Sequence, residues 1–258
     1  MKTRAVGHTG TLDPFATGLL VVLVGRGTRV ARFVEAQRKT YLATARLGIA
    51  TDTDDRTGAV VRETRTALPS DTEIVDALRG FLGPQRQRPP AYSAKRVAGQ
   101  RSHRLARRGL PPDLEPVAVT IHVLEVLGVA GAEVTFRVTA SAGTYIRALA
   151  RDLGECLGVG GHLAELRRET IGHLSVEHAV PMAGIEPGIE LQPLSTVLEH
   201  LPSVVLTDQT LANVAHGRAI AAPGQPDGWV VLLAGAELAA VGLVEHGRVH
   251  PRVVLVQQ

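Results

Sequence analysis

The segment from Gly7 to Leu20 constrains this chain most, because its composition rules out a regular helix. Its three glycines permit backbone angles closed to other residues, and Pro14 fixes a turn and pushes Asp13 toward an extended conformation. The apolar run 19–24 that follows predicts a buried strand. A carboxylate on a tight loop beside a sheet is well placed for chemistry, whereas an isolated Asp-Pro pair more often only caps a turn.

The composition is that of a soluble globular protein. The 258 residues, 45% hydrophobic and 21% charged, suffice for one large domain or for a large and a small one. The single cysteine, Cys156, excludes an internal disulfide and argues against cysteine-based metal centres. The histidines lack paired metal-ligand spacing, and the apolar runs are too short to span a membrane. We therefore expect a cytoplasmic protein with no metal site and no membrane contact.

Basic residues are concentrated in one stretch, although the formal net charge is only +3. Residues 84–110 contain no Asp or Glu, and their basic side chains are Arg86, Arg88, Lys95, Arg96, Arg101, Arg104, Arg107 and Arg108. Such a stretch repels itself unless a polyanion lies against it. Together with Tyr92 and several loop-forming Pro and Gly residues, it favours contact with RNA over a merely solvated surface.

Hydrophobic periodicity predicts an α+β fold with a mixed, mainly antiparallel sheet flanked by helices. Helices are expected at 28–36, 70–82, 100–108, 143–157 and 161–168, and strands at 40–49, 59–63, 117–129, 133–140 and 169–176. Four prolines mark 181–202 as a linker. Strand-like runs at 229–233, 239–244 and 253–256 predict a small β-rich module. The expected organisation is a main domain over 1–180, the linker 181–202 and the module over 203–258.

Two side chains could complete a site with Asp13. Tyr41 lies on the apolar face of the strand expected at 40–49, where most tyrosines simply pack. Arg147 lies in the first turn of the clearest helix, where an anion is normally favoured, so that it calls for a carboxylate partner such as Asp13. The acidic turn 51–58 lacks the ligands of a calcium loop, and a solvated hairpin tip is the favoured interpretation.

Taken together, these segments resemble the TruB-type tRNA pseudouridine synthases, which modify the uridine at position 55 in the T-arm. Gly7-His8-Thr9-Gly10-Thr11-Leu12-Asp13-Pro14 matches the catalytic loop of that family, and Lys39-Thr40-Tyr41 matches its Lys-x-Tyr strand. Later blocks match in the same order at 51–58, 92–95, 143–147 and 166–168. The resemblance covers nearly the whole chain. It implies a pseudouridine synthase catalytic domain over 1–180 and a PUA-like RNA-binding domain over 203–258.

The resemblance implies a cofactor-free isomerase in which Asp13 is the catalytic aspartate, Tyr41 the active-site tyrosine and Arg147 the ion-pair partner of Asp13. A carboxylate needs no metal for this chemistry, and a neighbouring cation favours its charged form. The target uridine must be extruded from the T-loop, with His8 filling the vacated space and Asp55 helping to hold the opened loop. The implied RNA contacts are His8, Asp55, Arg86, Arg88, Tyr92, Lys95, Arg96, Arg101, Arg104 and Tyr145. The implied partner is the T-arm of tRNA, bound by a monomer with no protein partner.

One departure from the family pattern concerns the N-terminus. Family members carry a strand with a Lys-Pro-x-Gly motif before the catalytic loop, whereas this chain begins at Met1. The resemblance therefore predicts either a start placed too late or a shortened protein. Two alternative functions remain open. One is a non-catalytic tRNA-binding protein or RNA-folding chaperone, and the other is a glycoside hydrolase with a second carboxylate about 5–10 Å from the first.

Overall fold

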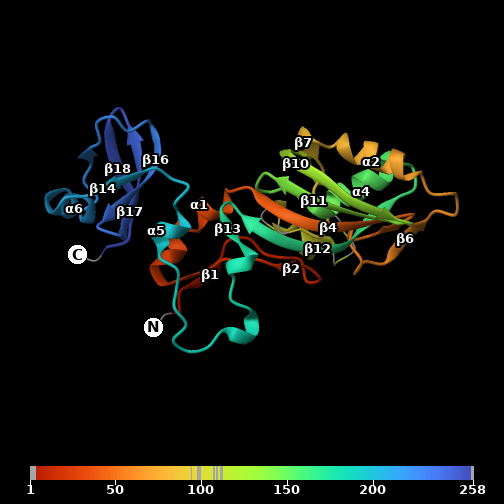
Figure 1. Ribbon diagram of the computed structural model, residues 1–258, viewed down its shortest axis with the longest axis horizontal. Coiled ribbons are helices and arrows are strands. Elements are labelled where there is room, and N and C mark those ends of the chain that lie inside the picture. The colour runs from red at the N-terminus through yellow and green to blue at the C-terminus, as the bar shows by residue number, and fades with distance from the viewer. Residues whose placement is uncertain are drawn as a thin grey trace. The chain divides into compact units, whose positions relative to one another are not determined.

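The computed structural model describes residues 4–93, 95–97, 100–106, 108, 110 and 113–256, with the backbone alone for 96, 97, 101 and 103. The chain divides into two compact units (Figure 1). One comprises residues 12–19 and 38–171, and the other comprises 1–11, 20–37 and 172–258. Each unit is therefore assembled from segments that lie far apart in the sequence.

The first unit is built on a mainly antiparallel sheet, as predicted. Its strands run in the order β12-β4-β11-β10-β7. They are β12 (Gly161–Ile171), β4 (Lys39–Leu47), β11 (Glu133–Ala140), β10 (Val117–Ala130) and β7 (Gly83–Gln87). The short strand β2 (Thr17–Gly18) pairs with β12 in parallel orientation. The mixed, mainly antiparallel sheet expected from the sequence is thus confirmed.

The core of this unit lies on one face of the sheet. Alternate residues of β4, from Tyr41 to Leu47, are buried there. Helices α2 (Asp71–Arg79) and α4 (Ile146–Cys156) cover that face (Figure 1) and bury Ile74 and Leu149 against it. The helix expected at 70–82 is present as α2, and a capping box marks its start, since Ser70 and Glu73 bond reciprocally.

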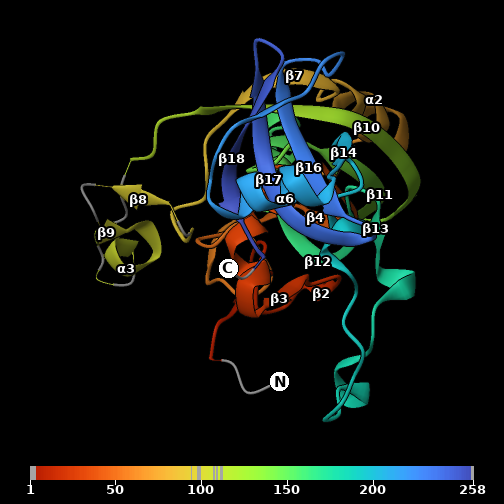
Figure 2. The same ribbon diagram turned by 90° about the vertical axis from the view of Figure 1, so that its left-hand side faces the viewer.

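Two segments of this unit lie outside the main sheet. The hairpin of β5 (Ile49–Thr51) and β6 (Val60–Glu63) follows β4 directly. The segment between β7 and β10 carries β8 (Arg96–Val97), β9 (Gln100–Arg101) and α3 (Ser102–Ala106), which stand to one side of the sheet in Figure 2. The helix predicted at 100–108 is therefore observed over a shorter range, and Arg107 and Gly109 lie outside the described residues.

The helix predicted over 161–168 is wrong. These residues begin β12, which pairs with β4 from Gly161 to Ile171 and includes the first three residues of the strand expected at 169–176. Leu, Ala, Glu and Arg favour a helix locally. Here the tertiary context overrides that preference, because the segment fills the place between β2 and β4 and buries Leu163 and Leu166 in the core.

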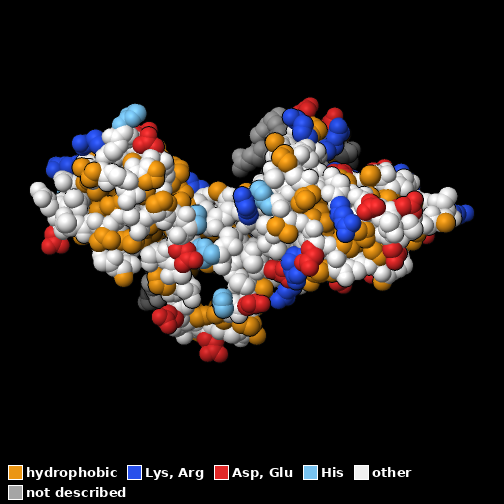
Figure 3. Space-filling view, turned by 45° about the horizontal axis from the view of Figure 1, so that its top comes forward, with side chains coloured by type: hydrophobic (Ala, Val, Ile, Leu, Met, Phe, Trp, Pro, Cys, Tyr) orange, Lys and Arg blue, Asp and Glu red, His pale blue; other side chains and the backbone are white. Residues whose placement is uncertain are grey.

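The second unit contains a five-stranded sheet in the order β14-β16-β17-β18-β15. Its strands are β14 (Ser203–Val205), β16 (Gly228–Ala234), β17 (Glu237–Glu245), β18 (Arg248–Val254) and β15 (Ile220–Ala221), with α6 (Asp208–Ala215) beside them. The chain leads into this sheet through β13 (Leu174–Ser175), η2 (Val176–His178), η3 (Met182–Gly184) and α5 (Leu194–Val197). Apolar side chains are prominent on its outer surface in Figure 3. The predicted β-rich module is present.

The same unit includes an N-terminal segment that the sequence did not assign to it. A hairpin of β1 (Val6–His8) and β3 (Val22–Val24) leads into η1 (Gly25–Val30) and α1 (Ala31–Glu35). Phe33 packs edge-on against Trp229, with ring centroids 5.0 Å apart. The buried strand expected at 19–24 is wrong, because only its last three residues are extended in β3 and Leu20 and Val22 are exposed. Among the described residues of both units, no helix is long and apolar enough to cross a membrane.

Candidate active site

The position of Asp13 is set by a turn and by the strand that follows it. The backbone amide of Ala16 donates to the carbonyl of Asp13 at 2.9 Å, which closes the turn around Pro14. Gly18 then pairs with Arg168 of β12 at a backbone angle of φ +100°. A Cβ atom at Gly18 would lie 2.2 Å from the carbonyl oxygen of Arg168, so only glycine fits this close approach. The loop carrying Asp13 is therefore fastened to the edge of the sheet.

The structure brings Asp13 and Arg147 together. Arg147 lies in the first turn of α4, and its side chain is 6% exposed. Its Nη2 donates to Oδ1 of Asp13 at 3.0 Å, and its Nε lies 2.9 Å from Oδ2 in an ion-pair contact. Both carboxylate oxygens of Asp13 thus face one guanidinium, which fixes the orientation of the carboxylate.

Asp55 holds the other side of the same guanidinium. Its Oδ2 lies 3.3 Å from Nη1 of Arg147, which also donates to the carbonyl of Thr53 at 2.8 Å. Its Oδ1 accepts hydrogen bonds from the side chain of Thr53 at 2.9 Å and from the backbone and side chain of Thr57 at 2.9 and 2.6 Å. The solvated hairpin tip expected at 51–58 is therefore wrong at this residue. Asp55 is 4% exposed, and its carboxylate is used inside the protein.

The ionisation of Asp13 reflects a balance of burial and charge. Burial raises the pKa of Asp13 above its ordinary value, while the Arg147 guanidinium acts to lower it. The negative charge of Asp55 acts in the raising direction. The net result is a raised pKa, so Arg147 orients the carboxylate but does not fully offset its desolvation.

Tyr41 belongs to the same site. It lies on the core face of β4, and burial raises the pKa of its phenol. The charge of Asp13 acts in the same direction, whereas the charge of Arg168 and a hydrogen bond from it act in the opposite one. Asp13 and Tyr41 are thus within electrostatic reach of each other.

A second arginine of α4 supports the acidic turn. Arg151 lies one turn after Arg147, and its Nη1 donates to Oδ2 of Asp54 at 2.9 Å. Its Nη2 donates to the carbonyl of Arg88 at 2.8 Å. Asp54 is one of the two described non-glycine residues with positive φ. Sequence reasoning missed Arg151, whose spacing of four from Arg147 was the available signal.

The predicted RNA contacts lie in several parts of the chain. His8 is exposed on β1 of the second unit. Arg86, Arg88 and Arg104 are exposed, while Tyr92, Lys95 and Tyr145 are half-buried. The side chains of Arg96 and Arg101 lie outside the described parts of the structure.

The segment that carries Tyr92 is bonded to Arg147, and the end of β7 is bonded to the start of α4. The carbonyl of Tyr92 accepts from Nη2 of Arg147 at 2.9 Å. Gln87, at the end of β7, bonds both backbone groups of Tyr145, the residue that precedes α4, at 2.8 and 3.0 Å. Gln87 is a second residue that sequence reasoning missed, since nothing local marks a buried glutamine at the end of a strand.

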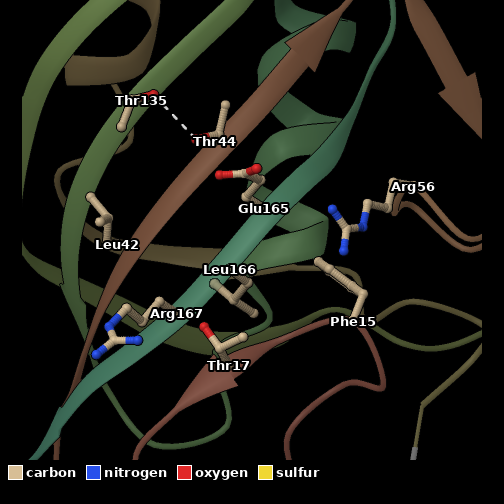
Figure 4. A pocket seen from close by; sticks show the side chains of 9 residues that line it. All are labelled: Phe15, Thr17, Leu42, Thr44, Arg56, Thr135, Glu165, Leu166 and Arg167. Atoms are coloured by element: carbon tan, nitrogen blue, oxygen red, sulfur yellow. Dashed lines mark hydrogen bonds between the residues drawn. The ribbon is translucent and has the colours of Figure 1, made fainter. Parts of the chain in front are cut away.

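A cavity of about 400 Å³ opens beside the Asp13 loop (Figure 4). The cavity lies on the face of the sheet opposite to Tyr41, because it is lined by Leu42 and Thr44, which alternate with the core residues of β4. Phe15 and Arg56 form one wall, with the guanidinium carbon 5.5 Å from the ring centroid. Within the described ranges, no three His, Cys, Asp or Glu side chains gather into a group suited to hold a metal ion.

Solved structures share this fold. The structure titled "Structure of H/ACA RNP bound to a substrate RNA containing 2'-deoxyuridine" contains a chain that is 27% identical, with a TM-score of 0.73 over 98% of this chain and 77% of that one. A "Crystal Structure of a Cbf5-Nop10-Gar1 Complex" matches with the same TM-score, identity and coverage. The mainly antiparallel sheet and these structural matches show that the chain has the pseudouridine synthase fold.

Matches to protein families identify which group of pseudouridine synthases the chain resembles. Residues 1–146 match the TruB family pseudouridylate synthase N-terminal domain, and residues 147–200 and 202–255 match C-terminal domains of the same enzymes. A tRNA pseudouridine synthase B of Aquifex aeolicus is 36% identical, covering 99% of this chain and 91% of the relative. One of Parasynechococcus marenigrum is 43% identical, covering 97% and 88%. The chain belongs to the TruB family of pseudouridylate synthases and is an isomerase.

Proposed function

We propose that this protein converts uridine to pseudouridine at position 55 in the T-arm of tRNA, with Asp13 as the nucleophile. The observation that carries the proposal is the contact of Arg147 with both carboxylate oxygens of Asp13. The relatives named tRNA pseudouridine synthase B support the choice of tRNA as substrate. No cofactor is required, because the isomerisation involves no net oxidation or reduction.

The chemistry requires one glycosidic C–N bond to break, the base to turn, and a C–C bond to form through C5. Asp13 attacks C1′ of the ribose while the C1′–N1 bond breaks and the base leaves as its N1 anion, and Arg147 holds the carboxylate in place during the attack. Loss of Asp13 from C1′ and of the C2′ proton then gives a glycal-like intermediate, and that proton returns to C2′ as C5 bonds to C1′. Tyr41 stacks on the base and its hydroxyl accepts the proton that C5 must lose. These roles fit the burial of the three side chains. The carboxylate of Asp13 is partly exposed, whereas Tyr41 and Arg147 are buried.

Exposed basic side chains and the second unit bind the RNA. The stretch from β7 to α3, with Arg86, Arg88 and Arg104, contacts phosphates and supplies most of the affinity. The target base is extruded from its loop, and His8 occupies the space that it leaves. The C-terminal module binds the acceptor end, and the protein works as a monomer.

The two alternative functions make different demands on the site. A glycoside hydrolase needs two carboxylates that both face the substrate. Asp55 does not meet this condition, because its oxygens are bonded to Thr53, Thr57 and Arg147. A non-catalytic RNA chaperone has no need of a buried arginine directed at a partly exposed carboxylate. The geometry favours the isomerase over both.

The experiment measures tritium release from a T-arm stem-loop carrying [5-³H]uridine at position 55. The parent is compared with Asp13→Asn and with Asp71→Asn, which removes an exposed carboxylate at the start of α2 as a matched control. We expect turnover by the parent and the control, none by Asp13→Asn, and RNA affinity within about threefold for all three, since phosphate contacts dominate binding. Tight binding without turnover by the parent would support the chaperone instead.

A further inference from the structure

Arg168 is among the most deeply buried side chains of the protein, at 2% exposure. The register of the sheet places it directly opposite Tyr41, on the same face. Its neighbours along that face, Ala43 and Leu166, are apolar. A guanidinium in such surroundings carries a large desolvation cost unless its donors are bonded. The groups that accept hydrogen bonds from the Arg168 guanidinium should therefore explain why it is buried here.

One group of bonds fastens Arg168 to the exit of the Asp13 loop. Its Nε donates to the carbonyl of Leu19 at 2.7 Å, and its own carbonyl accepts from the amide of Leu19 at 2.8 Å. Gly18 lies against the same carbonyl with no space for a side chain. The loop therefore leaves the active site along a path that Arg168 fixes on two sides.

The register sets the guanidinium opposite the Tyr41 phenol, and its charge and a hydrogen bond act to lower the pKa of Tyr41. Because a guanidinium has donors only, the phenol oxygen must act as the acceptor in this bond. The hydroxyl hydrogen of Tyr41 must therefore point away from Arg168. The bond also fixes the position of the Tyr41 oxygen relative to the Asp13 loop.

We propose that Arg168 is a positioning residue for the isomerisation: it holds the Tyr41 oxygen in register with Asp13 and stabilises the tyrosinate that takes up the C5 proton. This inference rests on the proposed function. In the last step, the base is already joined to C1′ through C5 and must lose the C5 proton. The electrons of the C5–H bond form the C5=C6 bond, and those of the C6=N1 bond move to N1. N1 takes up the phenol proton through water, the tyrosinate so formed takes up the C5 proton, and Tyr41 is thereby restored as the phenol.

The charges that face Tyr41 make this role necessary. Burial and the charge of Asp13 both oppose ionisation of the phenol, and Arg168 is the group that acts against them. The alternative is a purely structural role, in which Arg168 only ties β12 to the loop. That role would affect activity whether or not position 41 carries a hydroxyl.

The test is a double-mutant cycle between Arg168→Gln and Tyr41→Phe, with Arg167→Gln as control because Arg167 is exposed on the opposite face of the same strand. Single-turnover tritium release, RNA affinity and melting temperature are measured for each variant. We expect Arg168→Gln to slow release about 10- to 100-fold, with affinity unchanged within about threefold. In the Tyr41→Phe background, the same change should alter the residual rate by less than about threefold. An equal loss in both backgrounds would assign Arg168 a structural role only and overturn the proposal.

A second measurement does not depend on activity. The chain has three tyrosines, so ¹³Cζ-tyrosine labelling gives three resonances, and Tyr41→Phe identifies one of them. Arg168→Gln should move the titration of the Tyr41 resonance to higher pH, and an unmoved titration would refute the link. If Arg168→Gln does not fold, Arg168→Lys, which keeps the charge but loses the planar fork, replaces it in both experiments. If the parent has no activity, the proposed function fails, and the resonance still tests the contact.

Discussion

The sharing of Arg147 between two carboxylates makes Asp55→Asn an informative perturbation. The substitution keeps the shape and an acceptor oxygen for Thr53 and Thr57 but removes the charge 3.3 Å from Nη1 of Arg147. At an effective dielectric constant of about 20, two unit charges at this separation attract by roughly 5 kcal/mol, and desolvation cancels much of that energy. Arg147 keeps Asp13 as a partner. We therefore expect a loss of about 1–3 kcal/mol in the free energy of unfolding.

Activity should change in two ways. The single-turnover rate should fall roughly 5- to 150-fold, if the lost 1–3 kcal/mol comes from fixing Arg147 against Asp13 in the transition state. The acid limb of the pH–rate profile should move to lower pH, because the Asp55 charge is one of the causes that raise the pKa of Asp13. Urea unfolding and tritium release between pH 4 and 8 measure both effects.

The matched control is Asp52→Asn, which neutralises an exposed carboxylate in the same turn. It should change the rate and the acid limb little, because Asp52 accepts a bond from the amide of Ala59 and makes no contact with Arg147 among the described interactions. If Asp55→Asn left the acid limb in place, or moved it to higher pH, the account of Asp13 as a carboxylate between a cation and a second anion would be refuted.

Three further predictions follow from single contacts. Gly18→Ala should lower stability by about 3 kcal/mol or more and abolish turnover, since its Cβ would lie 2.2 Å from the Arg168 carbonyl oxygen at an unfavourable φ; thermal unfolding checks this. Gln87→Ala should cost about 1–3 kcal/mol in urea unfolding, because it leaves the backbone amide of Tyr145 without its acceptor and removes one of the two hydrogen bonds to the Tyr145 carbonyl. Asp13→Asn should stabilise the protein at pH 7 by up to about 1 kcal/mol. The folded pKa of Asp13 is raised, so stability is lost as pH rises through it, and the gain should vanish below roughly pH 4, where the parent is also protonated.

The sequence predicted elements well wherever the local pattern and the tertiary environment agree. The alternation in β4, the hairpin of β10 and β11 and the capping box of α2 all follow from residues close in the chain. It failed at β12 and at 19–24. At 161–168, residues that favour a helix locally are held as a strand by pairing with β4. At 19–24, an apolar run predicted a buried strand, but only its last three residues pair, with β1.

In the candidate site, too, some residues could be predicted from the local sequence, whereas others depend on tertiary pairing. The loop composition indicated Asp13, and the position of Arg147 at a helix start called for an anion, so this pair was predictable although 134 residues separate its members. The contacts of Asp55 and Arg168 were not, since an acidic turn and a basic pair at the end of an expected helix are typical of solvated surface. Their burial arises only from pairing: β12 sets Arg168 opposite Tyr41 and joins the acidic turn by a bridge from Asp55 to Leu163. The strand β12 thus positions the groups behind both Asp13 and Tyr41, which is why misassigning that strand as a helix concealed them.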